Sequence, residues 1–277
     1  IRSFKGLLPH ILVVLGFIVL ALAYFNPVLQ GKEIFQSDIV QYIGMAKEQN
    51  DFRAKTGEEP YWTDAAFGGM PTYQLGANYP HNYIKKIDTA LRFLPRPADY
   101  LFLYFIGFYI LLLVLKLDYK LAFLGAVAFG FSTYLIIILG VGHNAKAHAI
   151  AYMPMVLAGI LLCFRGKYIG GFLLLALGMA LEIGANHFQM TYYLLLLVIV
   201  LGIAYFVDAI QKNLLPHFFK SLGVMVAAVI LAIGANATNL LATQQYADFS
   251  TRGDTGLTIT PEGEEKPQEG LTYDYIT

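Results

Sequence analysis

The sequence is poor in charge and nearly free of cysteine. Of its 277 residues 14% are charged, Lys plus Arg equal Asp plus Glu at 19 each, and Cys163 is the single cysteine. A lone cysteine excludes an intrachain disulfide and a thiolate metal cage. A net charge of zero gives no reason to expect nucleic acid or an anionic surface as a partner.

Apolar residues make up most of what is present. Hydrophobic residues amount to 57% and the mean hydropathy is +0.57, far from the balance of a soluble domain. Several stretches approach the roughly 20 apolar residues that a helix needs to cross a bilayer, and none alternates polar and apolar residues as barrel strands do. They cover 7–29, 100–117, 121–142, 149–164, 168–184, 191–210 and 221–241. We therefore expect an all-α, polytopic membrane protein with about seven transmembrane helices.

These stretches divide the chain into four parts. Residues 1–29 form a first transmembrane helix, 30–99 an external loop, 100–242 a bundle of six transmembrane helices, and 243–277 the start of an external C-terminal segment. Because the chain begins without methionine and ends in a polar tail, we expect it to be part of a longer protein.

Basic residues near the span ends indicate the orientation, because Lys and Arg in short loops resist translocation. Pairs of them flank alternate ends of the predicted spans: Arg2 and Lys5, Lys116 and Lys120, Arg165 and Lys167, Lys212 and Lys220. The intervening short connections contain a single basic residue, Lys146. The N-terminus is therefore predicted to be cytoplasmic. The first span, which contains Ala21-Leu22-Ala23, also fits a cleaved signal peptide, and in both cases the next segment is external.

The external loop contains two stretches with the apolar spacing of an amphipathic helix. One follows Asp38, and the other covers 84–94, where Lys85, Lys86, Asp88 and Arg92 form the polar side. Such helices next to a membrane lie in its interface. Between them, the glycines and prolines of 60–71 disfavour regular structure, and the aromatic residues suit the headgroup region. We expect an ordered loop over the membrane surface.

Polar side chains gather at the predicted outer ends of the spans. The first span is followed by Gln36-Ser37-Asp38, and later spans by His143, Asn144, Lys146, His148, Glu182, Asn186, His187, Gln189, Asn236, Asn239, Gln244 and Gln245. Polar and ionisable groups near a bilayer are costly, so they commonly mark a functional site.

This set suits the transfer of a sugar from a lipid-linked phosphate to an acceptor hydroxyl. The lipid phosphate leaves readily if positive charge stabilises it, and Lys146 with His143 or His148 can supply that charge. The acceptor hydroxyl needs a general base, and Asp38 is the first external carboxylate close to a span. The donor's hydrocarbon tail would lie between helices. We predict Asp38 as catalytic, and as substrate- or phosphate-binding residues Lys146, His143, His148, Asn144, His187, Gln189, Trp62 and Gln245.

Three segments also resemble a known family. Phe35-Gln36-Ser37-Asp38-Ile39-Val40-Gln41-Tyr42, residues 62–71 with Phe67-Gly68-Gly69-Met70-Pro71, and Gly142-His143-Asn144-Ala145-Lys146 are similar to the YfhO family of bacterial membrane proteins. The early external loop with its aspartate resembles the C-type glycosyltransferase (GT-C) fold, in which such an acidic residue serves catalysis.

The resemblance implies a glycosyltransferase of the bacterial plasma (inner) membrane with its active site on the outer face. Its partners would be membrane lipids, a lipid-linked sugar donor of the undecaprenyl-phosphate class, and a cell-envelope polymer or lipid as acceptor. Members of this family are usually much longer, with more spans and a large external C-terminal part.

Other interpretations of the same residues stay open. Asp38 is followed three residues later by Gln41, the pattern of a helix N-cap with its capping-box partner. Lys146 can extend toward lipid phosphates, and Trp62 can anchor the interface. His143 and His148 are five residues apart, which does not place them on one helix face. A divalent cation between acid and phosphate fits the chemistry, but the sequence offers no convincing ligand set.

A transporter or flippase of a lipid-linked or small polar substrate is the main rival function, and a noncatalytic envelope-assembly subunit is another. Transporters have broken helices and polar groups near the bilayer midplane, commonly within an internal repeat. The predicted spans contain little that is polar beyond Ser132 and Thr133, and the two halves show no repeat. The sequence therefore favours the enzyme.

Overall fold

A computed structural model describes residues 4–247. The chain divides into two compact units, of which the first combines 1–47 with 79–236 and the second combines 48–78 with 237–277. The predicted external loop 30–99 therefore contributes to both units. Arg2, which supports the predicted orientation, and residues 248–277 of the predicted C-terminal segment lie outside the described residues.

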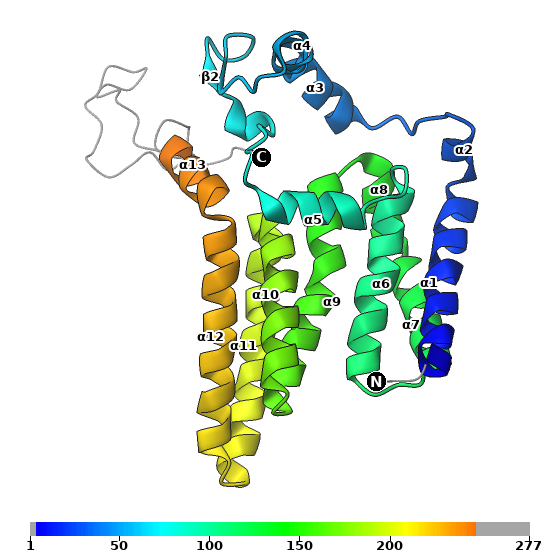
Figure 1. Ribbon diagram of the computed structural model, residues 1–277, viewed down its shortest axis with the longest axis vertical. Helices are drawn as coiled ribbons and strands as arrows, with labels where there is room; N and C mark the ends of the chain where they lie inside the picture. Colours follow the sequence, from blue (N-terminus) through cyan, green and yellow to red (C-terminus); the bar gives the residue numbers. More distant parts are fainter. Residues whose placement is uncertain (1–3, 248–277) are drawn as a thin grey trace, which may run out of the picture. The chain divides into compact units, whose positions relative to one another are not determined.

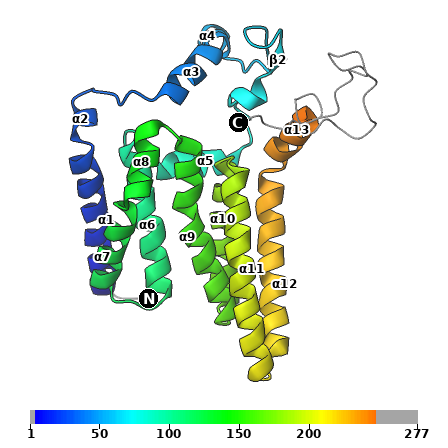
Figure 2. The same ribbon diagram turned by 180° about the vertical axis from the view of Figure 1, so that it is seen from behind.

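The first unit is a helical bundle that contains the apolar stretches of the sequence (Figures 1 and 2). Its helices are α1 Phe4–Tyr24, α2 Asn26–Leu29, α3 Ser37–Met45, α5 Tyr83–Leu91, α6 Ala98–Val114, α7 Tyr119–Gly130, α8 Thr133–Val141, α9 Asn144–Phe164, α10 Tyr168–Gly184, α11 Phe188–Gln211 and α12 Leu215–Ala235. In this bundle α6 packs against α1, α7 and α9, and α10 packs against α9 and α12.

Several of these helices have the length and composition of membrane spans. Within the described residues, α1, α9, α11 and α12 are long and apolar enough to cross a membrane, and α7 with α8 would make a fifth span as a bent pair. Helices α6 and α10 are apolar but contain 17 residues each, a length of roughly 25 Å against a hydrocarbon core of about 30 Å. The helical membrane-type architecture is thus confirmed with four to five candidate spans, and the sixth and seventh stay a prediction.

The predicted span 121–142 is not one helix. Helix α7 ends at Gly130, α8 begins at Thr133, and the two axes differ by 47°. Phe131 lies at the break, where its ring packs against Phe105 with centroids 5.3 Å apart and against Tyr24 at 5.1 Å. A break filled by aromatic rings leaves the apolar pattern of the sequence unchanged, which is why the pattern did not indicate it.

Two other predicted boundaries differ as well. Helix α9 begins at Asn144 rather than near residue 149, so Lys146 and His148 lie in its first turns. Helix α12 ends at Ala235 rather than near 241, and the chain continues as α13 in the second unit. Polar side chains at a helix end are compatible with a helix, although hydropathy assigns them to a loop.

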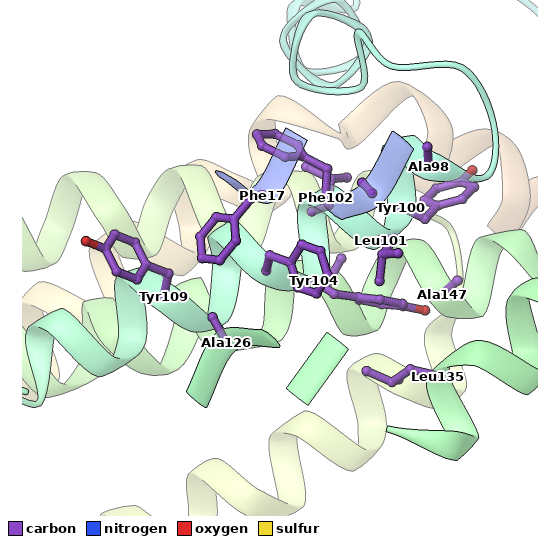
Figure 3. Close-up of a cluster of buried hydrophobic side chains, with 14 of the residues drawn as sticks. Phe17, Ala98, Tyr100, Leu101, Phe102, Tyr104, Tyr109, Ala126, Leu135 and Ala147 are labelled. Atoms are coloured by element: carbon purple, nitrogen blue, oxygen red, sulfur yellow. The ribbon is translucent and has the colours of Figure 1, made fainter. Parts of the chain in front are cut away.

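Aromatic and small residues shape the interior of the bundle (Figure 3). Phe17 of α1 stacks on Phe105 of α6 and Phe123 of α7, with ring centroids 5.3 and 5.2 Å apart. Glycines allow α9 to approach its neighbours closely, because a Cβ atom on Gly107 would lie 2.4 Å from the backbone oxygen of Ala151. Small residues at such contacts are typical of helices packed in a membrane.

Helix α5 lies across the end of the bundle at which α9 and α11 begin (Figures 1 and 2). The predicted amphipathic helix of 84–94 is thus present, with Lys85 and Lys86 exposed as an interfacial helix requires, but Asp88 and Arg92 turn inward. Asp88 is 7% exposed. The first unit therefore has charged groups beneath α5 that the predicted amphipathic pattern placed in water.

The second unit contains α4 Lys47–Thr56, β1 Trp62–Thr63, β2 Met70–Pro71, the 3₁₀ helix η1 Thr72–Leu75 and α13 Ala237–Ala247. The strands pair antiparallel, with Trp62 opposite Pro71 and Thr63 opposite Met70. The expectation of no regular structure in 60–71 was therefore wrong in this short hairpin. The turn is accommodated by Gly68 and Gly69, whose φ angles of 73° and 117° suit glycine.

Candidate functional site

Gln36 attaches the start of α3 to the turn between α8 and α9. Its amide nitrogen donates to the backbone oxygen of Leu139 at 2.7 Å, and its amide oxygen accepts from Asn144 Nδ2 at 3.3 Å. Gly142 makes room for this side chain, since its φ is 92° and a Cβ atom there would lie 2.8 Å from the Cβ of Gln36. The glycine, the glutamine and the asparagine of the resembling segments thus form one contact.

Asp38 lies in the first turn of α3 and points to His143. Its Oδ2 is 3.3 Å from His143 Nδ1, and the two side chains are 53% and 49% exposed. The alternative that Asp38 caps the helix was wrong, because α3 begins at Ser37 and Gln36 occupies the cap position without a side-chain cap bond. The carboxylate is therefore accessible and paired with an imidazole from a distant part of the chain.

His143, Lys146 and His187 form a group of basic side chains near Asp38. His143 precedes α9, Lys146 is half-buried in the first turn of α9, and His187 precedes α11. Burial lowers the pKa of His187, and the nearby charges of Lys146 and His143 lower it further. Three predicted residues from two connections thus lie within electrostatic reach of one another.

His187 also has an unsatisfied ring nitrogen. Its Nδ1 is buried and has no hydrogen-bond partner among the described residues. A buried polar atom without a partner costs free energy, so such an atom often indicates a ligand or water. Because Lys146 and His143 are adjacent, an anion such as a phosphate is the ligand that this position favours.

His148 belongs to a different, buried cluster that the sequence did not reveal. Asp88 of α5 bonds through Oδ1 to His148 Nε2, and the same oxygen accepts a hydrogen bond of 2.7 Å from the Tyr152 hydroxyl. Its Oδ2 pairs with Arg92 at 2.9 Å. His148 is 8% and Tyr152 1% exposed. His148 therefore holds α9 to α5, and its predicted part in substrate binding stays a prediction.

The cluster extends from Arg92 to the start of α6. Arg92 is 3.4 Å from Asp99 Oδ2, and Asp99 Oδ1 accepts from the backbone nitrogen of Tyr100 at 2.8 Å. Burial alone would raise the pKa of Asp88, but the hydrogen bond and charge of His148, with the charge of Arg92, outweigh it and hold this pKa at about 2. Asp88 is therefore an anion in a chain of alternating charges.

One signal for this cluster was present in the sequence. Asp88 and Arg92 are spaced by four residues on α5, and so are His148 and Tyr152 on α9. Each pair stacks on one helix face, but a sequence does not say that the two faces meet.

Two hollows adjoin these groups. A cleft of about 410 Å³ lies between residues 28–43, the loop 95–97 and Asn144. An apolar groove of about 580 Å³ begins at Phe188 and Thr191, directly after His187, and continues between α9, α10, α11 and α12 to Val198 and Ile160.

No family model, no curated protein and no solved structure matches the chain.

The remaining predicted residues lie elsewhere. Gln189 bonds to Tyr193 of its own helix, Nε2 to hydroxyl, at 2.9 Å. Trp62 and Gln245 belong to the second unit, where Trp62 donates to Asp64 at 2.9 Å. The predicted binding role of these three residues stays a prediction.

A cation would find two side-chain ligands at this site, the Asp38 carboxylate and a neutral His143 imidazole. Among the described residues no three His, Cys, Asp or Glu side chains gather as a metal site. Magnesium ions commonly take one or two carboxylates and complete their shell with water and substrate phosphate. Asp38 and His143 are therefore the residues that would hold such an ion.

Proposed function

We propose that this protein is a membrane glycosyltransferase that moves a sugar from a polyprenyl-phosphate donor to a cell-envelope acceptor. The observation that carries the proposal is the pairing of Asp38 with His143 beside Lys146 and His187. These groups come from three separate parts of the chain and combine an accessible carboxylate with the Lys146 ammonium and two imidazoles. Acid and cation so arranged match the two needs of this reaction, a base for the acceptor and a counter-charge for the leaving phosphate.

In the proposed reaction the acceptor oxygen attacks the anomeric carbon of the donor sugar. The bond from that carbon to the phosphate oxygen breaks, and the phosphate leaves with the electron pair. Asp38 takes the proton of the acceptor hydroxyl, while Lys146 supplies positive charge to the phosphate and the His187 imidazole donates a hydrogen bond to it. His143 touches the carboxylate at 3.3 Å, so it keeps Asp38 oriented during proton transfer.

The groove after His187 supports a donor with a long hydrocarbon tail. Its lining is almost wholly apolar, and its end at Phe188 and Thr191 directly follows His187 in the sequence. A polyprenyl chain in this groove would place its phosphate near His187 and Lys146. The hydrocarbon tail of the donor would then lie along α11 and α12, with its phosphate at the starts of α9 and α11.

The same proposal includes a topology. Seven spans, with α6 and α10 crossing as short helices, would place Asp38, His143, Lys146 and His187 at one membrane face. The charge pattern of the short loops would make that face the outer one, in a bacterial plasma membrane. An accessible polymer or lipid acceptor outside the cell is consistent with that placement.

Transport remains a second candidate, because the break between α7 and α8 is a feature that transporters share. In this protein the rings of Phe131 and Phe105 pack at the break, and its polar side chains are the uncharged Ser132 and Thr133. The charged and imidazole groups of the candidate site lie at helix ends instead. This distribution favours the transferase.

Asp38→Asn tests the proposal in the complete purified protein, reconstituted with a polyprenyl-phosphate sugar and an acceptor. Loss of a general base lowers turnover by about 100-fold or more, with unchanged thermal unfolding because Asp38 is half-exposed. Lys146→Ala in the same assay should weaken donor binding. Asp208→Asn, an exposed carboxylate paired with Lys212, is the matched control and should leave both quantities unchanged.

Wild-type rates in both the Asp38 and the Lys146 variants would refute the site. A carrier would instead move labelled donor across proteoliposomes in the Asp38 variant as fast as in the wild type.

A further inference from the structure

The cleft beside α3 contains charged groups of both signs. Lys32 and Glu33 lie on the segment that leads from the first span to α3, and Arg96 lies before α6. The Arg96 side chain is 57% exposed and 4.0 Å from Asp99, so most of its donors face outward. Two cations and one anion therefore line a cleft of about 410 Å³. Such a lining matches a ligand that carries a phosphate and, next to it, a hydrogen-bond donor.

The rest of the lining is apolar. Val28, Ile34, Ile39 and Ile43 contribute to its walls. The same segment exposes further apolar side chains, among them Phe35 at 80%, and none of residues 37–45 in α3 is buried. Exposed apolar side chains beside the end of a candidate span fit the boundary of headgroups and acyl chains. The occupant of the cleft should therefore have an apolar part as well as charge.

Asn144 provides an independent observation at the same place. It lines the cleft and is 9% exposed, and its Oδ1 has no hydrogen-bond partner among the described residues. Its amide nitrogen is already engaged by Gln36 at 3.3 Å. The unsatisfied atom is an acceptor, and it needs a donor such as an ammonium or hydroxyl group.

We propose that this cleft binds the headgroup of a membrane glycerophospholipid, with the phosphate at Arg96 and Lys32 and a headgroup donor at Glu33 and Asn144. The glycerol and the first carbons of the acyl chains would lie on the apolar walls. A bound lipid would link the segment before α3 to the segment before α6. It would thereby hold α3, and with it Asp38, against the bundle, whatever reaction the protein performs.

Native mass spectrometry of the complete protein in mild detergent, titrated with phosphatidylethanolamine, measures this binding. Lys32→Gln and the double variant Lys32→Gln/Arg96→Gln should bind the lipid at least about fivefold more weakly than the wild type. Lys32 is exposed and lies outside the helices, so its variant should keep the wild-type unfolding temperature. Lys212→Gln, which removes an exposed charge at the other end of the bundle, is the matched control and should bind like the wild type.

Two further arms identify the ligand. Glu33→Gln should lose any preference for phosphatidylethanolamine over phosphatidylglycerol, because only the former presents an ammonium to the carboxylate. Free sn-glycerol 3-phosphate should compete poorly, since it lacks the apolar part.

Equal lipid binding in the wild type and in both Lys32 variants would overturn the proposal. So would competition by sn-glycerol 3-phosphate, or by a soluble saccharide, at the concentration at which the lipid binds.

Discussion

The Asp88 carboxylate is buried between α5 and α9, and three side chains donate hydrogen bonds to it. His148 and Tyr152 bond to one oxygen and Arg92 to the other. Such a charge is tolerated in a low-dielectric interior only while its partners are present, and removal of one partner leaves another charge uncompensated. Loss of one member of the Asp88 cluster should therefore destabilise the α5 end of the bundle.

Asp88→Asn should lower the free energy of unfolding by about 3 kcal/mol, because Arg92 loses the nearer of its two carboxylate partners and His148 and Tyr152 lose their anionic acceptor. Titration of SDS into the detergent-solubilised protein measures this change. Asp208→Asn is the control, since Asp208 and Lys212 form an exposed pair that contributes no more than about 1 kcal/mol. An Asp88 variant as stable as the control would contradict the role given to the cluster.

The same residue determines a pH dependence. Its pKa is lowered from 3.8 to about 2 in the folded protein, so the folded state binds this proton less readily than the unfolded chain. The stabilisation is fully present above pH 3.8 and is lost as the pH falls toward 2. The difference in stability between wild type and Asp88→Asn should shrink over that range.

Single residues also show what a sequence can and cannot predict about a site. Asp38, His143, Lys146 and His187 were predicted together because the predicted topology places their positions at one membrane face, and the structure brings His143 to Asp38 and close to His187. Asp88 was predicted to lie on a solvated helix face. The amphipathic pattern of α5 separates a polar from an apolar face, but it does not tell whether water or protein covers the polar face. A helix whose charged residues pair with other charges inside the protein has the same sequence pattern.

At the scale of elements, close approach between α9 and α10 depends on glycine. A Cβ atom on Gly159 would lie 2.6 Å from the backbone nitrogen of Leu175, and one on Gly171 would lie 2.5 Å from Cys163 Sγ. In contrast, a Cβ atom on Gly202 of α11 meets nothing within 4 Å. Substitutions at these two kinds of glycine therefore distinguish the effect of helix packing on stability from the effect of helix propensity.

Gly159→Ala and Gly171→Ala should therefore each destabilise the protein by about 1–3 kcal/mol, because the added methyl group forces the helices apart. Gly202→Ala should be neutral or stabilising by up to about 1 kcal/mol, since alanine favours the helix. Thermal unfolding in detergent compares the three variants. A Gly202 variant that loses as much stability as the Gly159 variant would show that helix packing is not the cause.

Helix existence and helix ends were predicted with different success. Each predicted apolar stretch contains helix, because an apolar run of this length has few alternatives in lipid. The break near Phe131 and the early start of α9 were not predicted. Both depend on tertiary contacts, the aromatic rings around Phe131 in one case and the bonds of Asn144 and His148 in the other.

At the scale of the whole molecule, the basic residues at one end of the bundle and the site at the other make orientation testable. In a Cys163→Ser background, Ser37→Cys should react with a membrane-impermeant maleimide in intact cells. Lys212→Cys should react only after permeabilisation, because positively charged loops stay in the cytoplasm. The reverse labelling pattern would place Asp38 inside the cell and remove the external acceptor from the proposed reaction.

The attachment of Gln36 has a mechanical consequence for α3. If α3 tilts about this point, Asp38 lies only about 3 Å from the pivot along the helix and Met45 about 13 Å. A tilt of about 15° would then displace Asp38 by less than about 1 Å and Met45 by more than about 3 Å. With α3 attached at Gln36, the Met45 end of the helix can move to admit a bulky molecule while the Asp38 carboxylate keeps its distance from His143.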